Sequence, residues 1–347
     1  MYYACGVPAR RRRLALVIGG AALVVAVVWY RFGRPRTNHE VPLVMLPLAG
    51  GPELPEAEIS GLAWRGDELV LLPQYPRRFG EGSGAVFVVT RAAIEAVIDG
   101  RAPRLEVRTV PLEAPGLEES LEGFDGYEAI VLDGDDVYVA VEIRTASAAT
   151  VGYLFRGRAH GRPLERLTIA PDPRARLRAQ TELANMGYET LVVDGARVVA
   201  LYEANGDVNA APRALAFDRA LAPLGELPVE ELEYRVTDAS AADAEGRFWV
   251  ANYHWPGSPW QPGACRLTEE HGQGDSHARC RTVERLVELS ARGGRVATTG
   301  RPPILFELVD DAHARNWEGV VRLPGRGFLV MTDEHPASML AFVPEPR

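Results

Sequence analysis

Short runs of alternating apolar and polar residues, separated by tight turns, fill the chain from about residue 42 onward. Five runs share one pattern: a polar residue, a β-type stretch, a glycine turn and a second apolar run. They read ISGLAW, YEAIVL, YETLVV, ASAADA and WEGVVR, and their polar residues are Ser60, Glu128, Glu189, Ser240 and Glu318. Self-similarity at a period of about 50 residues, with four strands per repeat, is typical of propeller blades. The pattern therefore predicts an all-β, five-bladed β-propeller.

The strand count also predicts how the propeller closes. The last repeat offers EGVVRL, FLVMTD and SMLAFV, and the sequence then stops one strand short of four. An apolar run at residues 42–49 precedes the first repeat and has no partner within it. Because an unpaired edge strand is unfavourable, we expect this N-terminal run to supply the outer strand of the last blade. The propeller domain then spans residues 42–347.

The first 41 residues have a different character from the rest. Residues 1–13 form a basic segment, residues 14–30 are apolar, and residues 31–41 have the composition of a linker. Seventeen apolar residues are at the short end for a membrane span, and a basic cluster before an apolar run also fits a signal peptide. Bulky residues rather than a small-residue cleavage site follow the run. We expect one N-terminal transmembrane helix, an uncleaved signal anchor, with the body outside the cytoplasm.

The distribution of charge excludes some functions. All 38 basic residues are arginine, so lysine Schiff-base chemistry and a P-loop are excluded. Residues 1–40 hold seven arginines and one acid, which leaves 31 arginines against 46 acids in the body, a net charge of −15. An acidic body argues against binding nucleic acid and suits binding a cation. We expect a monomer.

Two cysteines bracket a polar stretch of the fourth repeat. Cys265 and Cys280 flank LTEEHGQGDSHAR, which the pattern predicts to be a hairpin between two strands. Outside the cytoplasm a disulfide would join them. His271 and His277 in the same stretch also allow a zinc site, although their spacing fits no standard zinc pattern.

Strand direction predicts two rings of polar side chains at one mouth of the central channel. Each first strand starts where the following strand ends, so a residue at the end of the second strand lies near the first polar residue. The second strands end at Gln74, Glu142, Glu203, Asn252 and Asp333. Four long loops, residues 73–84, 111–126, 170–187 and 252–263, reach the same mouth. Long loops on one face are the expected place for a binding site.

Three glutamates in the inner ring need neutralisation. Glu128, Glu189 and Glu318 would converge on one axis, and three close carboxylates require protons or a cation. A ring of oxygen ligands that also includes Ser60 and Ser240 suits a hard cation such as Ca²⁺. The structural alternative is that these groups bond neighbouring strands and keep the blades in register.

Other mouth residues are candidates for binding and catalysis. Arg144 and Arg315 could hold phosphate oxygens, Glu142 or Glu203 could act as a base, and His254 could be a general acid or base. The predicted substrate-binding set is Gln74, Glu142, Arg144, Glu203, Asn252, Arg315 and Asp333. The sequence contains neither a Gly-x-Ser-x-Gly nucleophile motif nor a His-Glu-x-x-His zinc motif.

The five runs resemble the blade starts of bacterial phytase-like ("esterase-like activity of phytase") domains and of SdiA-regulated periplasmic proteins. NWEGVVRLPGRGFLVMTDEHPASMLAF resembles the closing blade of the phytase-like domain. The order Ser, Glu, Glu, Ser, Glu resembles the central calcium site of calcium-activated nucleotidases (apyrases). That resemblance implies Ca²⁺ at the inner ring and hydrolysis of a nucleotide di- or triphosphate at the mouth. No substrate-binding residue of the nucleotidases carries over.

Two functions remain open from the sequence. The first is a membrane-anchored, extracytoplasmic, Ca²⁺-dependent hydrolase of phosphoesters or phosphoanhydrides. The second is a non-catalytic binding module, in which Ca²⁺ is structural and the loops bind a small anionic ligand or a protein partner. The acidic second ring disfavours strongly anionic substrates unless cations screen it.

Overall fold

A computed structural model describes residues 38–145, 150–333, 335 and 337–346. The predicted basic segment and transmembrane helix lie outside these residues. None of the helices in the described ranges is long and apolar enough to span a membrane.

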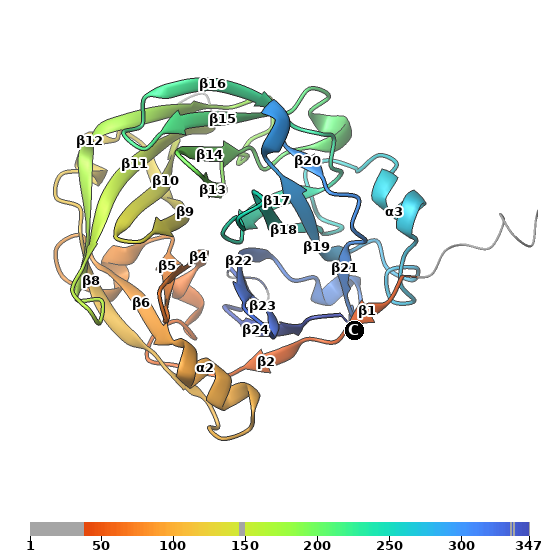
Figure 1. The fold of residues 1–347 in the computed structure, drawn as a ribbon, viewed down its shortest axis with the longest axis horizontal. Coiled ribbons are helices and arrows are strands. Elements are labelled where there is room, and N and C mark those ends of the chain that lie inside the picture. The colour runs from red at the N-terminus through yellow and green to blue at the C-terminus, as the bar shows by residue number, and fades with distance from the viewer. Residues whose placement is uncertain (1–37, 146–149, 334, 336, 347) are drawn as a thin grey trace, which may run out of the picture.

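Strand pairing within the described residues forms five units, here called blades 1 to 5, around a common centre (Figure 1). Blade 1 contains β4 (Ile59–Arg65), β5 (Glu68–Pro73), β6 (Ala85–Thr90) and β8 (Arg108–Glu113). Blade 2 contains β9 (Phe124–Asp133), β10 (Asp136–Arg144), β11 (Thr150–His160) and β12 (Arg166–Arg178). Blade 3 contains β13 (Thr190–Asp194), β14 (Arg197–Leu201), β15 (Arg213–Asp218) and β16 (Pro223–Pro228).

The last two blades use strands from both ends of the chain. Blade 4 contains β17 (Arg235–Ala239), β18 (Arg247–His254), β19 (Val283–Ser290), β20 (Ala297–Thr298), β21 (Ile304–Phe306) and, parallel to β21, β1 (Glu40–Val41). Blade 5 contains β22 (Trp317–Leu323), β23 (Gly327–Thr332), β24 (Leu340–Pro344) and the N-terminal β2 (Val44–Leu46). β2 pairs antiparallel with β24, so part of the predicted run does form the outer strand of the last blade.

The remaining elements are short. β3 (Leu48–Ala49) pairs with β7 (Leu105–Glu106), and β8 and β12 join blades 1 and 2 at their outer edges. The α-helices are α2 (Arg91–Ile98) and α3 (Arg266–His271). Single 3₁₀ turns are η1 (Pro55–Ala57), η2 (Pro76–Phe79), η3 (Glu118–Ser120), η4 (Gly206–Val208), η5 (Arg292–Gly294) and η6 (Asp311–His313).

Two local expectations from the sequence were wrong. Residues 266–279 form α3 and turns rather than a hairpin, because the stretch holds no β-alternation to pair. Residues 170–178, expected in a loop, continue β12, because Ala175 and Leu177 point inward between exposed arginines.

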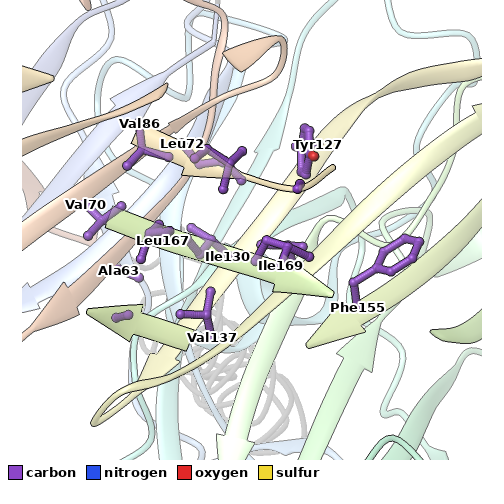
Figure 2. Packing of buried hydrophobic residues seen from close by; sticks show 14 of the residues in the cluster. Ala63, Val70, Leu72, Val86, Tyr127, Ile130, Val137, Phe155, Leu167 and Ile169 are labelled. Atoms are coloured by element: carbon purple, nitrogen blue, oxygen red, sulfur yellow. The ribbon is translucent and has the colours of Figure 1, made fainter. Parts of the chain in front are cut away.

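The core lies between the blades. Each of five buried apolar clusters joins two neighbouring blades, including blade 5 with blade 1. Figure 2 shows the cluster between blades 1 and 2, where Val70 and Leu72 of β5 pack with Ile130 and Val137. Leu69 and Leu71 on the opposite face of β5 belong to the cluster with blade 5. Because both faces of a middle strand are buried, its sequence is a continuous apolar run.

Candidate functional site

One residue in each blade interrupts the pairing of the two innermost strands. In blade 1, Ile59 pairs with Pro73 and Gly61 with Leu72, so Ser60 has no opposite residue. The same interruption occurs at Glu128, Thr237 and Glu318 in blades 2, 4 and 5. In blade 3, Glu189 directly precedes β13 at the corresponding place. A β-bulge redirects the side chain of its extra residue, and here the five extra residues form the inner ring.

The structure places Thr237, not Ser240, in the inner ring. Ser240 follows the last residue of β17, and its Oγ accepts a hydrogen bond from the Trp249 amide at 3.0 Å within the β17–β18 hairpin. That hairpin is longer than the others, because Thr237 precedes its turn glycine, Gly246, by nine positions. In the other blades this spacing is six or seven positions, and it pointed to Ser240.

A signal for the correct position was available in the sequence. A large apolar residue precedes every inner-ring residue: Ile59, Tyr127, Tyr188, Val236 and Trp317. Ser240 instead follows Ala239. The apolar residue packs into an interblade cluster, so its size identifies the register better than the distance to the turn.

The two hydroxyl members of the inner ring bond the next blade. Ser60 Oγ donates to the Tyr127 carbonyl at 2.6 Å, which joins blade 1 to blade 2. Thr237 Oγ1 donates to the Trp317 carbonyl, which joins blade 4 to blade 5. The structural alternative raised by the sequence therefore describes the observed contacts of these two hydroxyl groups.

The second ring contains Tyr253 where the sequence predicted Asn252. Across each inner hairpin, the second-ring residue faces the residue two positions before the inner ring; Tyr253, for example, pairs with Arg235. Asn252 is one position earlier, so its side chain points to the other face of the strand. It is buried there, donates to the carbonyls of Glu233 and Arg235, and accepts from Arg285 Nε at 2.7 Å.

A cavity of about 810 Å³ opens at this mouth. Its lining brings together eight of the predicted site residues: Gln74, Glu128, Glu142, Arg144, Glu189, Arg315, Glu318 and Asp333. Each of the four long loops contributes at least one lining residue, such as Tyr75, Asp125, Asn185 or Trp255. The predicted residues Ser60, Glu203, Ser240, Asn252 and His254 are outside this lining. Eight carboxylates and three arginines line the cavity, so it attracts cations.

Desolvation and mutual repulsion perturb the carboxylates of the cavity. Burial raises the pKa of Glu128, Glu189 and Glu318 well above the usual range, and neighbouring carboxylates raise it further. Burial, followed by the charge of Glu203, raises the pKa of Glu142 to about 8. These carboxyl groups therefore favour protons or a bound cation at neutral pH.

Two glycines make room for second-ring side chains of the preceding blade. A Cβ atom on Gly187 would lie 1.2 Å from Glu142 Oε1, and one on Gly126 would lie 2.4 Å from Gln74 Cγ. Gln74 Nε2 in turn donates to Glu128 Oε1 at 2.9 Å. The repeated Gly-Tyr-Glu at 126–128 and 187–189 thus encodes the contact between the two rings.

Arg235 occupies the position of these glycines in blade 4, and the sequence reasoning missed it. Its side chain is buried, lines the cavity, and donates through Nη1 to Glu203 Oε1. Its guanidinium opposes the upward shift of the pKa values of Glu189 and Glu318. Arg235 Nε has no hydrogen-bond partner among the described residues. The other cavity arginines, Arg144 and Arg315, pair with Asp125 and Glu284 at 2.7 Å.

The remaining predicted residues have other surroundings. His254 is buried, and burial, assisted by the charge of Arg235, lowers its pKa to about 4, so its imidazole is neutral at neutral pH. Cys265 and Cys280 are free thiols, so the predicted disulfide is not formed. Cys265 begins α3, and its sulfur accepts a hydrogen bond from Arg285 instead.

No protein-family model matches the chain, and no curated protein matches it. Among solved structures, it is similar to a glutaminyl cyclase from Myxococcus xanthus, with 12% identity, 88% of this chain and 100% of that chain covered, and a TM-score of 0.41. It is also similar to a soluble aldose sugar dehydrogenase from Escherichia coli, with 12% identity, 88% and 100% coverage, and a TM-score of 0.43. A GH43 endo-arabinanase from Bacillus licheniformis has 9% identity, 86% and 96% coverage, and a TM-score of 0.45. Similarity at this level carries nothing about substrate or reaction.

Proposed function

We propose that the mouth cavity is a Ca²⁺-dependent site for a small phosphorylated ligand. The observation that carries the proposal is the excess of buried carboxylate over cationic charge at the inner ring. Glu128, Glu189 and Glu318 meet there, and the Arg235 guanidinium opposes the upward pKa shifts of Glu189 and Glu318. A bound divalent cation would remove the repulsion that raises their pKa values.

The donor set fits a hard cation. Among the described residues, Glu142 Oε1 and Glu189 Oε2 are buried oxygens without a hydrogen-bond partner. Carboxylate oxygens are the ligands that Ca²⁺ prefers, whereas soft sulfur ligands are absent from the cavity lining. We assign Glu128, Glu189 and Glu318 as the residues that would hold the ion. Ser60, and Thr237 which replaces Ser240 in the ring, use their hydroxyl hydrogens to join blades, so we do not assign them as ligands.

Arg235 supports an anionic ligand next to the cation. Its unpartnered Nε and its place in the cavity wall leave a donor for a phosphoryl oxygen. The exposed side chains of Arg144 and Trp255 lie at the same cavity, the first as a charged contact and the second as an apolar one. Because the negative charge of the eight cavity carboxylates outweighs the positive charge of the arginines, an anionic ligand would bind only when the cation is present.

Hydrolysis of a phosphoester or phosphoanhydride is the reaction we propose. When bound, the cation would polarise a phosphoryl oxygen. Glu142 lines the cavity, and its raised pKa keeps its carboxyl protonated at neutral pH, so it can donate a proton to a leaving oxygen. Glu203 and His254 are less suited, because both lie outside the cavity lining.

Calorimetry and turnover on the same protein test these statements separately. Chelator-treated protein is titrated with Ca²⁺, alongside Glu189→Gln and the control Glu226→Gln, an exposed position on β16 of the same blade. We expect Glu189→Gln to lose at least about tenfold in Ca²⁺ affinity and the control to lose none, a difference of about 1.4 kcal/mol. Unchanged binding in Glu189→Gln would show that the ring assignment is wrong.

A non-catalytic binding module is the second candidate. The observation that favours it is that Ser60 and Thr237 use their hydroxyl hydrogens to join blades, so the ring already has a structural role. Nucleotides, phosphate monoesters, phytate and aryl esters are screened with Ca²⁺ and with EGTA. Ca²⁺-dependent turnover lost in Glu142→Gln supports the hydrolase. No turnover, together with a large Ca²⁺-dependent rise in melting temperature, supports the binding module.

We also propose that residues 14–30 anchor the protein in a membrane with the propeller outside the cytoplasm. The support is the sequence pattern alone: a basic cluster before 17 apolar residues and no cleavage site after them. Retention in the membrane fraction after an alkaline carbonate wash is expected for the full chain. Release into the supernatant would contradict the anchor.

A further inference from the structure

A second, smaller cavity on blade 4 contains a buried arginine beside a thiol. The cavity has a volume of about 220 Å³ and is separate from the mouth cavity in its lining. Its charged or titratable lining residues are Tyr234, Cys265, Glu269, His277, Cys280, Arg281 and Arg285. Neither the cation site nor the proposed reaction uses any of them.

Arg285 carries a positive charge into the protein interior without a carboxylate partner. It is 2% exposed, and no ion pair joins it to an Asp or Glu within the part of the chain that the structure describes. Apart from the Cys265 thiol, its neighbours are neutral groups: Nε donates to Asn252 Oδ1 at 2.7 Å, and the guanidinium lies 5.0 Å from the Tyr234 ring centroid. A buried guanidinium is costly unless an anion faces it.

The anion available to Arg285 is the sulfur of Cys265. Arg285 Nη2 donates to Cys265 Sγ at 3.2 Å, and Thr268 of α3 also favours the charged form of this sulfur. Glu284 pairs with Arg315 and Glu40 with His277, and no ion pair joins the cavity residue Glu269 to Arg285 within the described residues. Burial raises the pKa of the Cys265 thiol, but Arg285 and Thr268 together reverse that effect and lower it.

The position of Arg285 is fixed by the strands around it. Arg285 pairs with Asn252 of β18 and Leu305 of β21, so its backbone is held on both sides. Asn252, which the sequence predicted as a ligand-binding residue, instead orients the guanidinium toward the sulfur. Because the side chain is held before any reaction, little ordering is needed when the sulfur becomes charged.

We propose that Cys265 is a thiolate paired with Arg285 and a modification site for small electrophiles of the peroxide class. In this reaction the sulfur attacks one oxygen of the peroxide and the O–O bond breaks. The other oxygen leaves as hydroxide and takes the proton of the newly formed S–OH group to become water. Cys265 is oxidised to a sulfenate and the peroxide is reduced. The negative sulfenate oxygen keeps its ion pair with Arg285.

The chain supplies an internal control in Cys280, which lines the same cavity. Cys280 is half-buried, and burial followed by the charge of Asp311 raises the pKa of its thiol. An ordinary thiol with a pKa of about 8.5 is only a few per cent ionised at neutral pH. Both cysteines therefore meet the same reagents through one cavity. Among the described residues, Cys265 accepts a hydrogen bond from a guanidinium, whereas the charge of Arg279 near Cys280 does not offset burial.

Site-resolved alkylation of the full chain tests the proposal. Iodoacetamide is applied from about pH 5.5 to 9.5, and mass spectrometry gives the rate at each cysteine relative to its own limiting rate at high pH. This normalisation removes differences in access. At neutral pH we expect the normalised rate at Cys265 to exceed that at Cys280 by at least about tenfold, since one pKa unit is a factor of ten. Hydrogen peroxide followed by dimedone should label Cys265.

Two variants assign the effect to the ion pair. Arg285→Gln should move the alkylation profile of Cys265 toward that of Cys280, and Arg285→Lys should restore part of the difference. A second measurement needs no variant of Arg285: the ultraviolet absorbance of the thiolate is followed against pH, and the absorbance of Cys265→Ser is subtracted. The difference gives the ionisation of Cys265 directly. Matching pH profiles for Cys265 and Cys280, or absorbance that appears only in the alkaline range, would overturn the proposal.

Discussion

The buried carboxyl of Glu142 should make the stability of the metal-free protein fall as pH rises. Its folded pKa is about 8 against a usual value of 4.5. Between these values the folded protein holds a proton that the unfolded chain has lost, so unfolding releases a proton and becomes easier as pH rises. The effect begins above the unfolded pKa and is complete above about pH 8.

The magnitude follows from the shift. One pKa unit corresponds to about 1.4 kcal/mol, so Glu142 alone lowers the free energy of unfolding by roughly 3 kcal/mol between about pH 5 and pH 8. Glu142→Gln keeps the shape of the side chain and removes the titration. The difference in stability between this variant and the unsubstituted protein should therefore grow by that amount over the same range. Taking the difference cancels groups that titrate in both proteins, such as His254.

Urea unfolding of both proteins in the presence of a chelator, at several values between about pH 5 and pH 8, measures the difference. Glu226→Gln, on the exposed strand β16, is the matched control and should show a constant difference. If the Glu142→Gln difference is also constant, Glu142 is not desolvated as the structure has it, and its use as a proton donor fails with it.

Other predictions concern contacts that hold the blades and the site in place. Glu40→Gln should lower stability by about 3 kcal/mol at neutral pH, because four hydrogen bonds from residues 276–277 outweigh burial and hold the pKa of Glu40 at about 2, below the usual 4.5. In urea unfolding this contribution should disappear as pH falls from 4.5 toward 2, and a loss that does not depend on pH would contradict the prediction. Gly187→Ala should lower the free energy of unfolding by at least about 2 kcal/mol, because the new methyl group clashes with the Glu142 carboxylate. In a Glu142→Ala background the same substitution should cost much less, and equal costs in both backgrounds would show that the clash lies elsewhere. Ser60→Ala should lower the free energy of unfolding by about 1–3 kcal/mol, because the hydrogen bond to the Tyr127 carbonyl is lost. The Ca²⁺ affinity measured by calorimetry should change less than about twofold, and a tenfold loss would show that Ser60 is a ligand.

The repeat and the position of the site could be predicted from the sequence because they depend on local patterns. Alternating apolar runs specify strands, and the missing fourth strand of the last repeat predicted that residues 42–49 supply the outer strand of the last blade; residues 44–46 do pair with β24. The glutamates 128, 189 and 318 stand out for a similar reason: each is a charged residue where a strand would otherwise bury an apolar one.

Blade 4 shows what local pattern alone could not decide. Its inner-ring residue is a threonine and its second-ring residue a tyrosine, so neither carries the charge that marks blades 2, 3 and 5, and a longer hairpin moved the turn glycine. Thr237 and Tyr253 are in place because strand register is set by packing against blades 3 and 5, not by distance to a turn.

Only the tertiary structure decided which charges meet. Arg235 and Glu203 are 32 positions apart, and Arg285 and Cys265 are 20 positions apart; both pairs are buried side by side. Spacing between two cysteines suggested a disulfide, but the fold gives one of them a guanidinium instead. Polar residues along a strand are visible in the sequence, whereas the partner that a buried charge requires is chosen by the packing of separate blades.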